Sequence, residues 1–381
     1  MNNNEIRYRI NNLHEHHFDH HYKDGLNVMS KPFDTTPDAD SGFHFADKST
    51  IMKYLGYGVY IREVIPHKYP DTIIIRDPSG KKFRTNKIYL GKRYLLSDVL
   101  TFKILYSRGV NFRVSHDFAI RWAAKNGYFD ILLFLIKIGC DFKAKNHYAL
   151  RWASRNGHIK VVKLLVKLGA DVTANNYEAL RFAAYNGKLD VVKFLIKSGS
   201  KITIDKNYAV NWAAYNGHHD VVEYIMHKYK IQSKLQETLS RACEGGHLNI
   251  VELLINYGVN FHFNNEEPLR KASIEGHFEI VQFLLTMNCN VTVNNNECSR
   301  KAASNGHLNV LKLLVQHGAN IHDKHNEAVR HAAFNGHLSV VKFLVKTGAN
   351  YKIYNNYALN KATINGHHEI VNYFTSLETS R

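Results

Sequence analysis

Two stretches of this sequence decide its fold. Residues 175–204 read NNYEALRFAAYNGKLDVVKFLIKSGSKITI, and residues 324–353 read KHNEAVRHAAFNGHLSVVKFLVKTGANYKI. They align without gaps, and the first glycine of this unit recurs at Gly127, Gly157, Gly187, Gly217, Gly246, Gly276, Gly306, Gly336 and Gly366. Seven of the eight intervals between these glycines are 30 residues long and one is 29. A fixed period of this length predicts a solenoid in which each unit stacks on its neighbours.

Each unit is expected to form two short helices. In the unit that starts near residue 175, the first helix is predicted over residues 178–185 and the second over residues 189–197, where apolar residues recur at helical spacing. Gly187 and Gly199 are expected to end these helices, because glycine readily adopts the positive φ found after a helix C-terminus. The ten or so residues that follow are interpreted as an Asn-rich extended turn.

The unit resembles the ankyrin repeat. The resemblance is carried by Ala-Ala-x-Asn-Gly-His-x-x-Val-Val-Lys-Leu-Leu-x-x-x-Gly-Ala-Asp/Asn, as seen in residues 152–171 and 302–320. Ankyrin units usually have ~33 residues, so the connection between units is about three residues shorter here. The short, Asn-rich unit is similar to the ankyrin-repeat proteins of giant DNA viruses of amoebae, which are mimivirus-like. The family's Thr-Pro-Leu-His opening is altered, and Arg or Asn is expected to replace its Thr–His hydrogen bond.

The resemblance implies a mostly α fold, an ankyrin-repeat solenoid of about nine 30-residue helix-turn-helix units. The array is expected over residues 115–381, with units that start near residues 115, 145, 175, 205, 234, 264, 294, 324 and 354. Residues 94–114 are expected to form a half-repeat cap, because they include a stretch similar to a second helix followed by Gly109. Between Gly217 and Gly246 the spacing is shorter and Tyr229 replaces the turn glycine, which predicts a kink or weak joint over residues 229–236.

A small α+β domain is predicted for residues 1–93, which lack the repeat. Strand-like runs occur at residues 59–65, 72–76, 82–85 and 87–90, with a hairpin signal at residues 77–80 and a short helix predicted at residues 50–55.

Composition narrows the class of protein. A hydrophobic fraction of 45% is too high for a disordered chain. The apolar runs are too short to span a membrane, and the N-terminus lacks the apolar core of a signal peptide. We therefore expect an intracellular protein, in the host cytoplasm if it is viral, and a monomer that does not bind membranes. The four cysteines have no paired spacing, which agrees with a reducing compartment.

Two groups of histidines are candidate chemical sites. The first lies near the N-terminus, at His14, His16, His17, His20 and His21. Its crowded, irregular spacing differs from that of zinc sites, so it is interpreted as a polar strand or loop. The second recurs once per unit, at His158, His218, His247, His277, His307, His337 and His367. Its periodicity predicts a structural role, such as a hydrogen bond to the neighbouring unit. No catalytic or phosphate-binding motif is found, so no enzyme, metal or cofactor is expected.

One stripe of the first helices changes along the chain. Positions i, i+3, i+4 and i+7 share one helix face, and in the first four units this face is aromatic and basic. In later units the i and i+4 positions instead pair opposite charges, as in Glu237 and Arg241. The candidate partner-binding residues on this stripe are Trp122, Tyr148, Trp152, Phe182, Tyr185, Tyr208, Trp212 and Tyr215, with Arg121, Arg151 and Arg181. The alternative is that these aromatic side chains only fill space between helices.

The resemblance implies a non-enzymatic scaffold that binds a partner protein through the concave face of the array, in the manner of a viral host-interaction protein. The alternative function is nucleic-acid or polyanion binding, since the net charge is +17 and the stripe combines Arg with aromatic residues. Lysines of the second helices, such as Lys163 and Lys312, recur at repeat spacing and are expected to face solvent.

Overall fold

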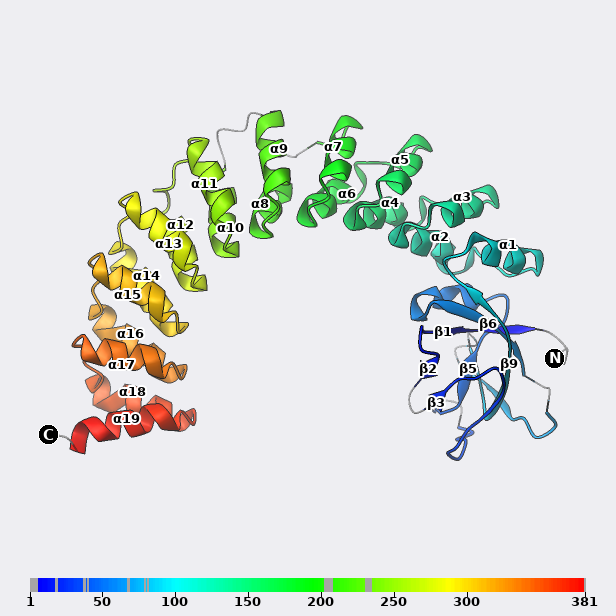
Figure 1. Cartoon of the computed structure of the whole chain (residues 1–381), viewed down its shortest axis with the longest axis horizontal. Helices are drawn as coiled ribbons and strands as arrows, with labels where there is room; N and C mark the ends of the chain where they lie inside the picture. The colour runs from blue at the N-terminus through cyan, green and yellow to red at the C-terminus, as the bar shows by residue number, and fades with distance from the viewer. Residues whose placement is uncertain are drawn as a thin grey trace. The chain divides into compact units, whose positions relative to one another are not determined.

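The computed structural model describes residues 6–17, 20–36, 39, 41–66, 69–78, 80, 82–201, 208–229 and 235–379 (Figure 1). The chain divides into two compact units. The first comprises Met1–Ala183 and Asp190–Lys201, and the second comprises Ala184–Leu189 and Ile202–Arg381. Within the described residues, no helix combines the length and the apolar character that crossing a membrane requires.

The first unit begins with a strand-rich part, residues 6–95, called the β-domain below. Its strands are β1 (Arg7–Asn11), β2 (His16–His17), β3 (His20–His21), β4 (Gly25–Val28), β5 (Phe43–Phe45), β6 (Tyr60–Ile65), β7 (Ile74–Arg76), β8 (Phe83–Thr85) and β9 (Lys87–Leu95). They form three antiparallel sheets with the orders β1-β6-β9-β4, β5-β8-β7 and β2-β3. A buried apolar cluster includes Tyr22, Phe43, Phe45, Phe83 and Ile88.

The predicted strands and short helix of this domain are found. β6, β7 and β8 lie within the predicted runs, and the 3-10 helix η1 (Ile51–Tyr57) begins one residue after the expected start. β9 is longer than predicted and continues to Leu95, past the expected boundary at residue 93. β1, β4 and β5 were not predicted, because they are short and carry polar residues among the apolar ones.

The remainder of the chain is helical. The helices are α1 (Val99–Ser107), α2 (Val114–Asn126), α3 (Phe129–Lys137), α4 (Ala144–Asn156), α5 (Ile159–Lys167), α6 (Ala174–Tyr185), α7 (Leu189–Lys197), α8 (Tyr208–Tyr215), α9 (His219–Tyr229), α10 (Gln236–Gly245), α11 (Leu248–Asn256), α12 (Glu267–Glu275), α13 (Phe278–Thr286), α14 (Val293–Ser304), α15 (Leu308–Gln316), α16 (Asp323–Phe334), α17 (Leu338–Lys346), α18 (Ile353–Ile364) and α19 (His368–Thr379).

Helices of the same unit pair in chain order, as α2 does with α3 and α10 with α11, and pairs within a unit pack side by side. In the first unit α2 contacts α4 and α3 contacts α5, while α1 contacts α3 as a preceding second helix would. In the second unit the even-numbered helices from α8 to α18 contact one another in sequence. Small residues permit this close approach: Ala183 and Ala184 are completely buried, as are Ala302 and Ala303. The bounds of α7 agree with the predicted second helix, and Gly187 and Gly199 have φ of 66° and 97° as expected.

The connection between units differs from the expected extended turn. In the repeat that contains α14, residues Asn294, Asn295 and Asn296 have φ of 51°, 59° and 57°, so three consecutive residues are left-handed before the right-handed helix begins. The same conformation occurs at residues 115–117, 145–147, 175–177, 264–266, 324–326 and 354–356. Left-handed backbone costs roughly 1–2 kcal/mol for each ordinary residue but suits Asn, whose short polar side chain bonds locally. The Asn-rich composition therefore marks a left-handed turn rather than an extended one.

The predicted weak joint lies mostly outside the described residues, since residues 230–234 are not described. Tyr229 is the last residue of α9, which has 11 residues where α7 and α11 have 9. The helix therefore continues through the position at which glycine ends the helix in other units. The joint itself stays a prediction.

The β-domain packs against the first helices of its own unit. η1 contacts α2, and the Asn111 N–H donates a hydrogen bond to the Lys48 carbonyl at 2.8 Å. Arg108, just after α1, forms an ion pair with Glu63 of β6 at 2.6 Å.

Candidate functional site

The stripe residue at position i+3 holds the left-handed turn of its own unit. Arg300 Nε donates to the Asn295 carbonyl at 2.8 Å, and Nη2 donates to the Asn294 carbonyl at 3.0 Å. Equivalent pairs of bonds to the turn carbonyls are made by Arg121, Arg151, Arg270 and Arg330, and Arg181 makes the Nη2 bond. In the last unit Asn360 Nδ2 donates to the Asn355 carbonyl. Arg, or Asn in the last unit, therefore bonds the turn of its own unit from the position where the family motif is altered; that it replaces the family's Thr–His hydrogen bond stays a prediction.

The same arginines reach the next unit along the chain. Arg151 Nη1 pairs with Glu178 Oε2 at 2.6 Å, and Arg300 pairs with Glu327 at 2.7 Å. Where position i is aromatic, the guanidinium instead lies over the ring, as Arg121 does at 5.1 Å from the Tyr148 centroid. Carboxylate and aromatic face both attract a cation. At position i of the next unit, a carboxylate and an aromatic ring therefore serve the same structural role as the partner of this arginine.

Trp122 of the candidate set is a packing residue. Only 9% of its surface is exposed. Its ring stacks on Phe102 of α1 with centroids 6.0 Å apart and contacts Tyr128 at 5.0 Å. Its ring thus lies between α1 and α2.

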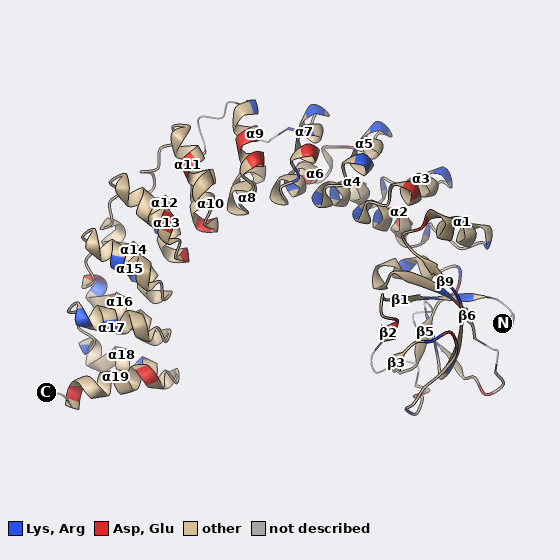
Figure 2. Ribbon diagram, viewed as in Figure 1, with Lys and Arg blue, Asp and Glu red and all other residues tan. Residues whose placement is uncertain are grey.

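Trp152 has a different environment, half-buried at the centre of a cation–aromatic cluster in the first unit. Its ring stacks on Tyr148 at 5.4 Å and meets the edge of Phe182 at 6.3 Å. Arg155 lies 4.6 Å above the ring and Lys125 lies 4.8 Å from it. Neither of these two cations forms an ion pair with any residue that the structure describes. Figure 2 shows Lys and Arg on the labelled helices α2, α4 and α6.

The second unit holds a separate aromatic cluster. Trp212 is half-buried and contacts Tyr185, Tyr208 and Tyr215, with centroids 5.7, 5.8 and 5.4 Å away. Tyr185 and Tyr208 are 40% and 45% exposed. Arg241 lies 5.7 Å from the Trp212 centroid and also pairs with two glutamates of its own helix, Glu237 and Glu244. This cluster therefore lacks the unpaired cations of the first.

The periodic histidines link neighbouring units, as expected. The ring Nε2 of His307 bonds the Ile274 carbonyl at 3.0 Å, so each histidine satisfies a carbonyl near the end of the preceding first helix. The same bond is made by His158, His218, His247, His277 and His367. The ring also packs on the preceding unit's glycine: a Cβ placed on Gly276 would lie 2.4 Å from His307 Nδ1. The glycine is therefore required for contact as well as for its φ of 83°.

One group of possible metal ligands occurs among the described residues. The ligand atoms of His262, Glu266 and Cys289 lie within 4.8 Å of one another. His262 Nδ1 is 2.9 Å from Glu266 Oε1, and the Asn290 N–H donates to the same oxygen at 3.3 Å. Another repeat makes the equivalent bonds through His322, Asn326 and the Asn350 N–H, and there an alanine replaces the cysteine. Repeat geometry accounts for the cluster without an ion.

Four of the five N-terminal histidines lie on two short strands, β2 and β3, and His14 precedes them. His16 pairs with His21 and His17 with His20 across the β2–β3 hairpin. Among the residues that the structure describes, these histidines belong to no group of three possible metal ligands.

The sequence was compared with known proteins. The family model for ankyrin repeats, built on three copies, matches residues 98–176, 120–207, 210–295 and 300–379. The chain is also similar to proteins of Acanthamoeba polyphaga mimivirus that are named as ankyrin repeat proteins. R229 is 43% identical over 122 residues, 30% of this chain and 40% of R229. R868 is 36% identical over 137 residues, 35% of this chain and 67% of R868. R896 is 30% identical over 135 residues, 35% of this chain and 41% of R896. The matches thus span less than half of R229 and of R896.

Proposed function

Because the chain belongs to the ankyrin-repeat family, we propose that it is a non-enzymatic scaffold of about nine units that binds a partner protein through its first helices. Stacked repeats offer an extended binding surface on one side of the array. The mimivirus relatives favour a partner from a host cell.

The cation–aromatic cluster of the first unit supports this proposal. Trp, Tyr and Arg dominate the energetics of protein interfaces, and Trp152 with Arg155 and Lys125 presents two of these types and a second cation on one face. Because both cations lack a carboxylate partner among the described residues, an acidic segment of the partner would gain charge-assisted contacts there. We therefore propose that the partner contacts this cluster through acidic residues.

Polyanion binding is the second candidate function. Single-stranded nucleic acids stack bases on aromatic side chains and pair phosphates with Arg and Lys, and the Trp152 cluster holds both kinds of group. The exposed lysines of the second helices, among them Lys163 and Lys312, would add a diffuse positive field.

A double variant tests the proposal. The full chain and Trp152→Ala/Arg155→Ala serve as baits in cells of the natural host, and the captured protein is then titrated against both purified baits. We expect the double variant to bind at least about tenfold more weakly, since removing interface hot spots costs about 2 kcal/mol or more. A matched control, Lys163→Ala/Lys312→Ala, removes two exposed cations from second helices and should bind normally.

Melting temperatures separate binding from packing. Weaker binding by a double variant that melts like the parent chain supports the proposal. A lower melting temperature with unchanged affinity would assign the cluster to packing alone. Tight binding of single-stranded RNA that weakens steeply with salt would favour the polyanion function instead.

A further inference from the structure

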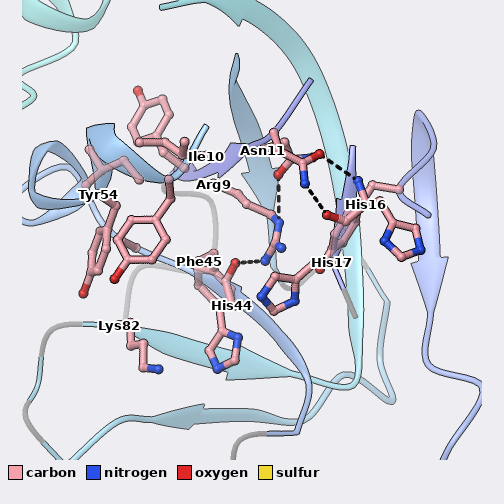
Figure 3. Close-up of a pocket in the computed structure, with 15 residues that line it drawn as sticks. Arg9, Ile10, Asn11, His16, His17, His44, Phe45, Tyr54 and Lys82 are labelled. Carbon is pink, nitrogen blue, oxygen red and sulfur yellow. Dashed lines mark hydrogen bonds between the residues drawn. The ribbon is translucent and has the colours of Figure 1, made fainter. Parts of the chain in front are cut away.

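The β-domain contains a pocket that is remote in sequence from the first-helix stripe. Its volume is about 300 Å³, at the lower end of the range typical for small-molecule sites. Figure 3 shows Arg9 and Asn11 of β1, His44 of β5, Tyr54 of η1 and Lys82 around it. All of these residues belong to the first unit.

Arg9 is the buried charge of this pocket, with 6% of its surface exposed. Its Nε donates to Asn11 Oδ1 at 2.9 Å and its Nη1 donates to the His44 carbonyl at 2.5 Å. The guanidinium also lies 4.1 Å from the centroid of the Tyr22 ring. These partners are all neutral. Among the residues that the structure describes, no carboxylate pairs with Arg9 and no group accepts a hydrogen bond from Nη2.

The neighbouring strand makes this arrangement more costly. Arg62 of β6 lies directly opposite Arg9 in the antiparallel register, and like charges placed opposite each other are destabilising. Arg62 is neutralised by Glu15 and Asp24, which leave Arg9 as the uncompensated member of the pair. Burial lowers the pKa of Arg9, which reflects the cost of keeping this charge away from water. An anion in the pocket would remove much of that cost.

The rest of the lining is also suited to an anion. It includes a second cation, Lys82, and no Asp or Glu among the described residues. Burial is the main cause that raises the pKa of Tyr54, followed by the charge of Asp77, with smaller effects of Tyr57 and Asp47. Asp47 Oδ1 already accepts hydrogen bonds from Ser49 and Thr50. Tyr54 supplies an aromatic wall for the uncharged part of a ligand.

We propose that this pocket binds a small organic anion, in which a carboxylate or phosphate group meets Arg9 and an aromatic or apolar body lies against Tyr54. Guanidinium recognises both kinds of anion through paired hydrogen bonds. Lys82 is the second cation of the site. Anion binding in this pocket does not depend on partner binding at the Trp152 cluster.

Two simple anions test the site on the full chain. Phenyl phosphate and benzoate are titrated by calorimetry and by amide NMR, with benzyl alcohol as the uncharged control. We expect at least one anion to bind and to shift the amide signals of Arg9, His44 and Lys82, while benzyl alcohol does not. Stronger binding of phenyl phosphate would identify a phosphate ester as the ligand class, and stronger binding of benzoate a carboxylate.

Variants connect binding to the named residues. Lys82→Ala should weaken anion binding several-fold, and Arg9→Met should weaken it by about tenfold or more, because a charge-assisted hydrogen bond is lost. Arg76→Met removes a cation of β7 that does not line the pocket, and it should leave binding unchanged. If Arg9→Met does not fold, the anion affinity of Lys82→Ala and the amide shifts of the parent chain test the proposal. The proposal is overturned if neither anion shifts these amides, if benzyl alcohol binds equally well, or if Lys82→Ala binds as the parent chain does.

Discussion

Arg62 Nη1 donates to Glu15 Oε2 at 2.7 Å, and the two side chains are only 1% and 8% exposed. Arg62 also pairs with Asp24, whose side chain is 90% exposed. The two carboxylates thus neutralise the same buried cation from very different environments. Without Glu15, Arg62 would keep only its exposed partner and lose the buried one, which is costly, whereas water can take the place of the exposed Asp24.

We therefore expect Glu15→Gln to lower the free energy of unfolding of the β-domain by about 3 kcal/mol, in line with the loss of one partner of a buried ion pair. Asp24→Asn is the matched control and should cost less than about 1 kcal/mol. Urea denaturation followed by the far-UV circular dichroism of the full chain measures both. Equal losses for the two variants would contradict the distinction between them.

The periodic histidine can be tested at one repeat. His307→Ala removes the bond from Nε2 to the Ile274 carbonyl, and we expect a loss of about 1 kcal/mol in the free energy of unfolding. Lys312→Ala, at an exposed position of the helix that follows His307, controls for truncation alone. If His307 does not stabilise the array, His307→Ala and Lys312→Ala should shift the denaturation curve by the same small amount.

The array should lose stability as the pH falls. Burial is the main cause that lowers the pKa of His218 and of His337 below the usual 6.5. As the pH drops below 6.5, the histidines of the unfolded chain bind protons before those of the folded chain. The stability that the two histidines add to the folded array is therefore fully present above pH 6.5 and is lost as the pH falls through their folded pKa. Histidine titrates at roughly pH 5 to 8. Over this range the melting temperature of His218→Gln/His337→Gln should decline less than that of the parent chain. Parallel curves for parent and variant would refute this assignment.

The arginine of the stripe needs its fork-shaped guanidinium. Arg300 bonds two turn carbonyls and also pairs with Glu327. Lysine keeps the charge but cannot make these bonds together, so Arg300→Lys should cost about 2 kcal/mol of unfolding free energy. Lys301→Gln, at the adjacent position, should change the denaturation midpoint little. If Arg300→Lys is as mild as Lys301→Gln, the charge alone is what matters.

The left-handed turn makes its own prediction at Asn295, which has φ 59° and ψ 53°. Asn295→Val should destabilise the array by about 2 kcal/mol, because a β-branched residue is strained in this region, whereas Asn295→Gly should be nearly neutral. The two denaturation midpoints measure the difference. An extended turn would tolerate valine, so equal midpoints would contradict the left-handed conformation.

Much of the array could be predicted from sequence because its signals are local and repeated. The period places the helices, and Gly187 and Gly199 end them since positive φ is cheap for glycine. The altered family motif drew attention to the position of Arg300 and its equivalents, but it did not predict their bonds to the turn carbonyls. Predicting the turn failed, because Asn is typical of turns in general and its frequency does not distinguish left-handed from extended backbone.

The candidate face was only partly visible in the sequence. Helical spacing placed the aromatic residues on one stripe, yet Trp122 is buried against Phe102, whereas Trp152 lies under Arg155. The difference depends on which helix packs alongside each ring, and spacing within one helix carries no information about that.

By itself the sequence determined the repeat architecture of this protein, its helix limits and the role of the periodic histidine, since each depends on residues at short, regular separations. Only the tertiary structure decided that the arginines hold the turns and that Arg9 remains a buried cation without a carboxylate. The β1–β6 register places Arg9 opposite Arg62, which is 53 residues away in the sequence. Contacts of that kind follow from how β-strands assemble, and no local pattern in the chain encodes them.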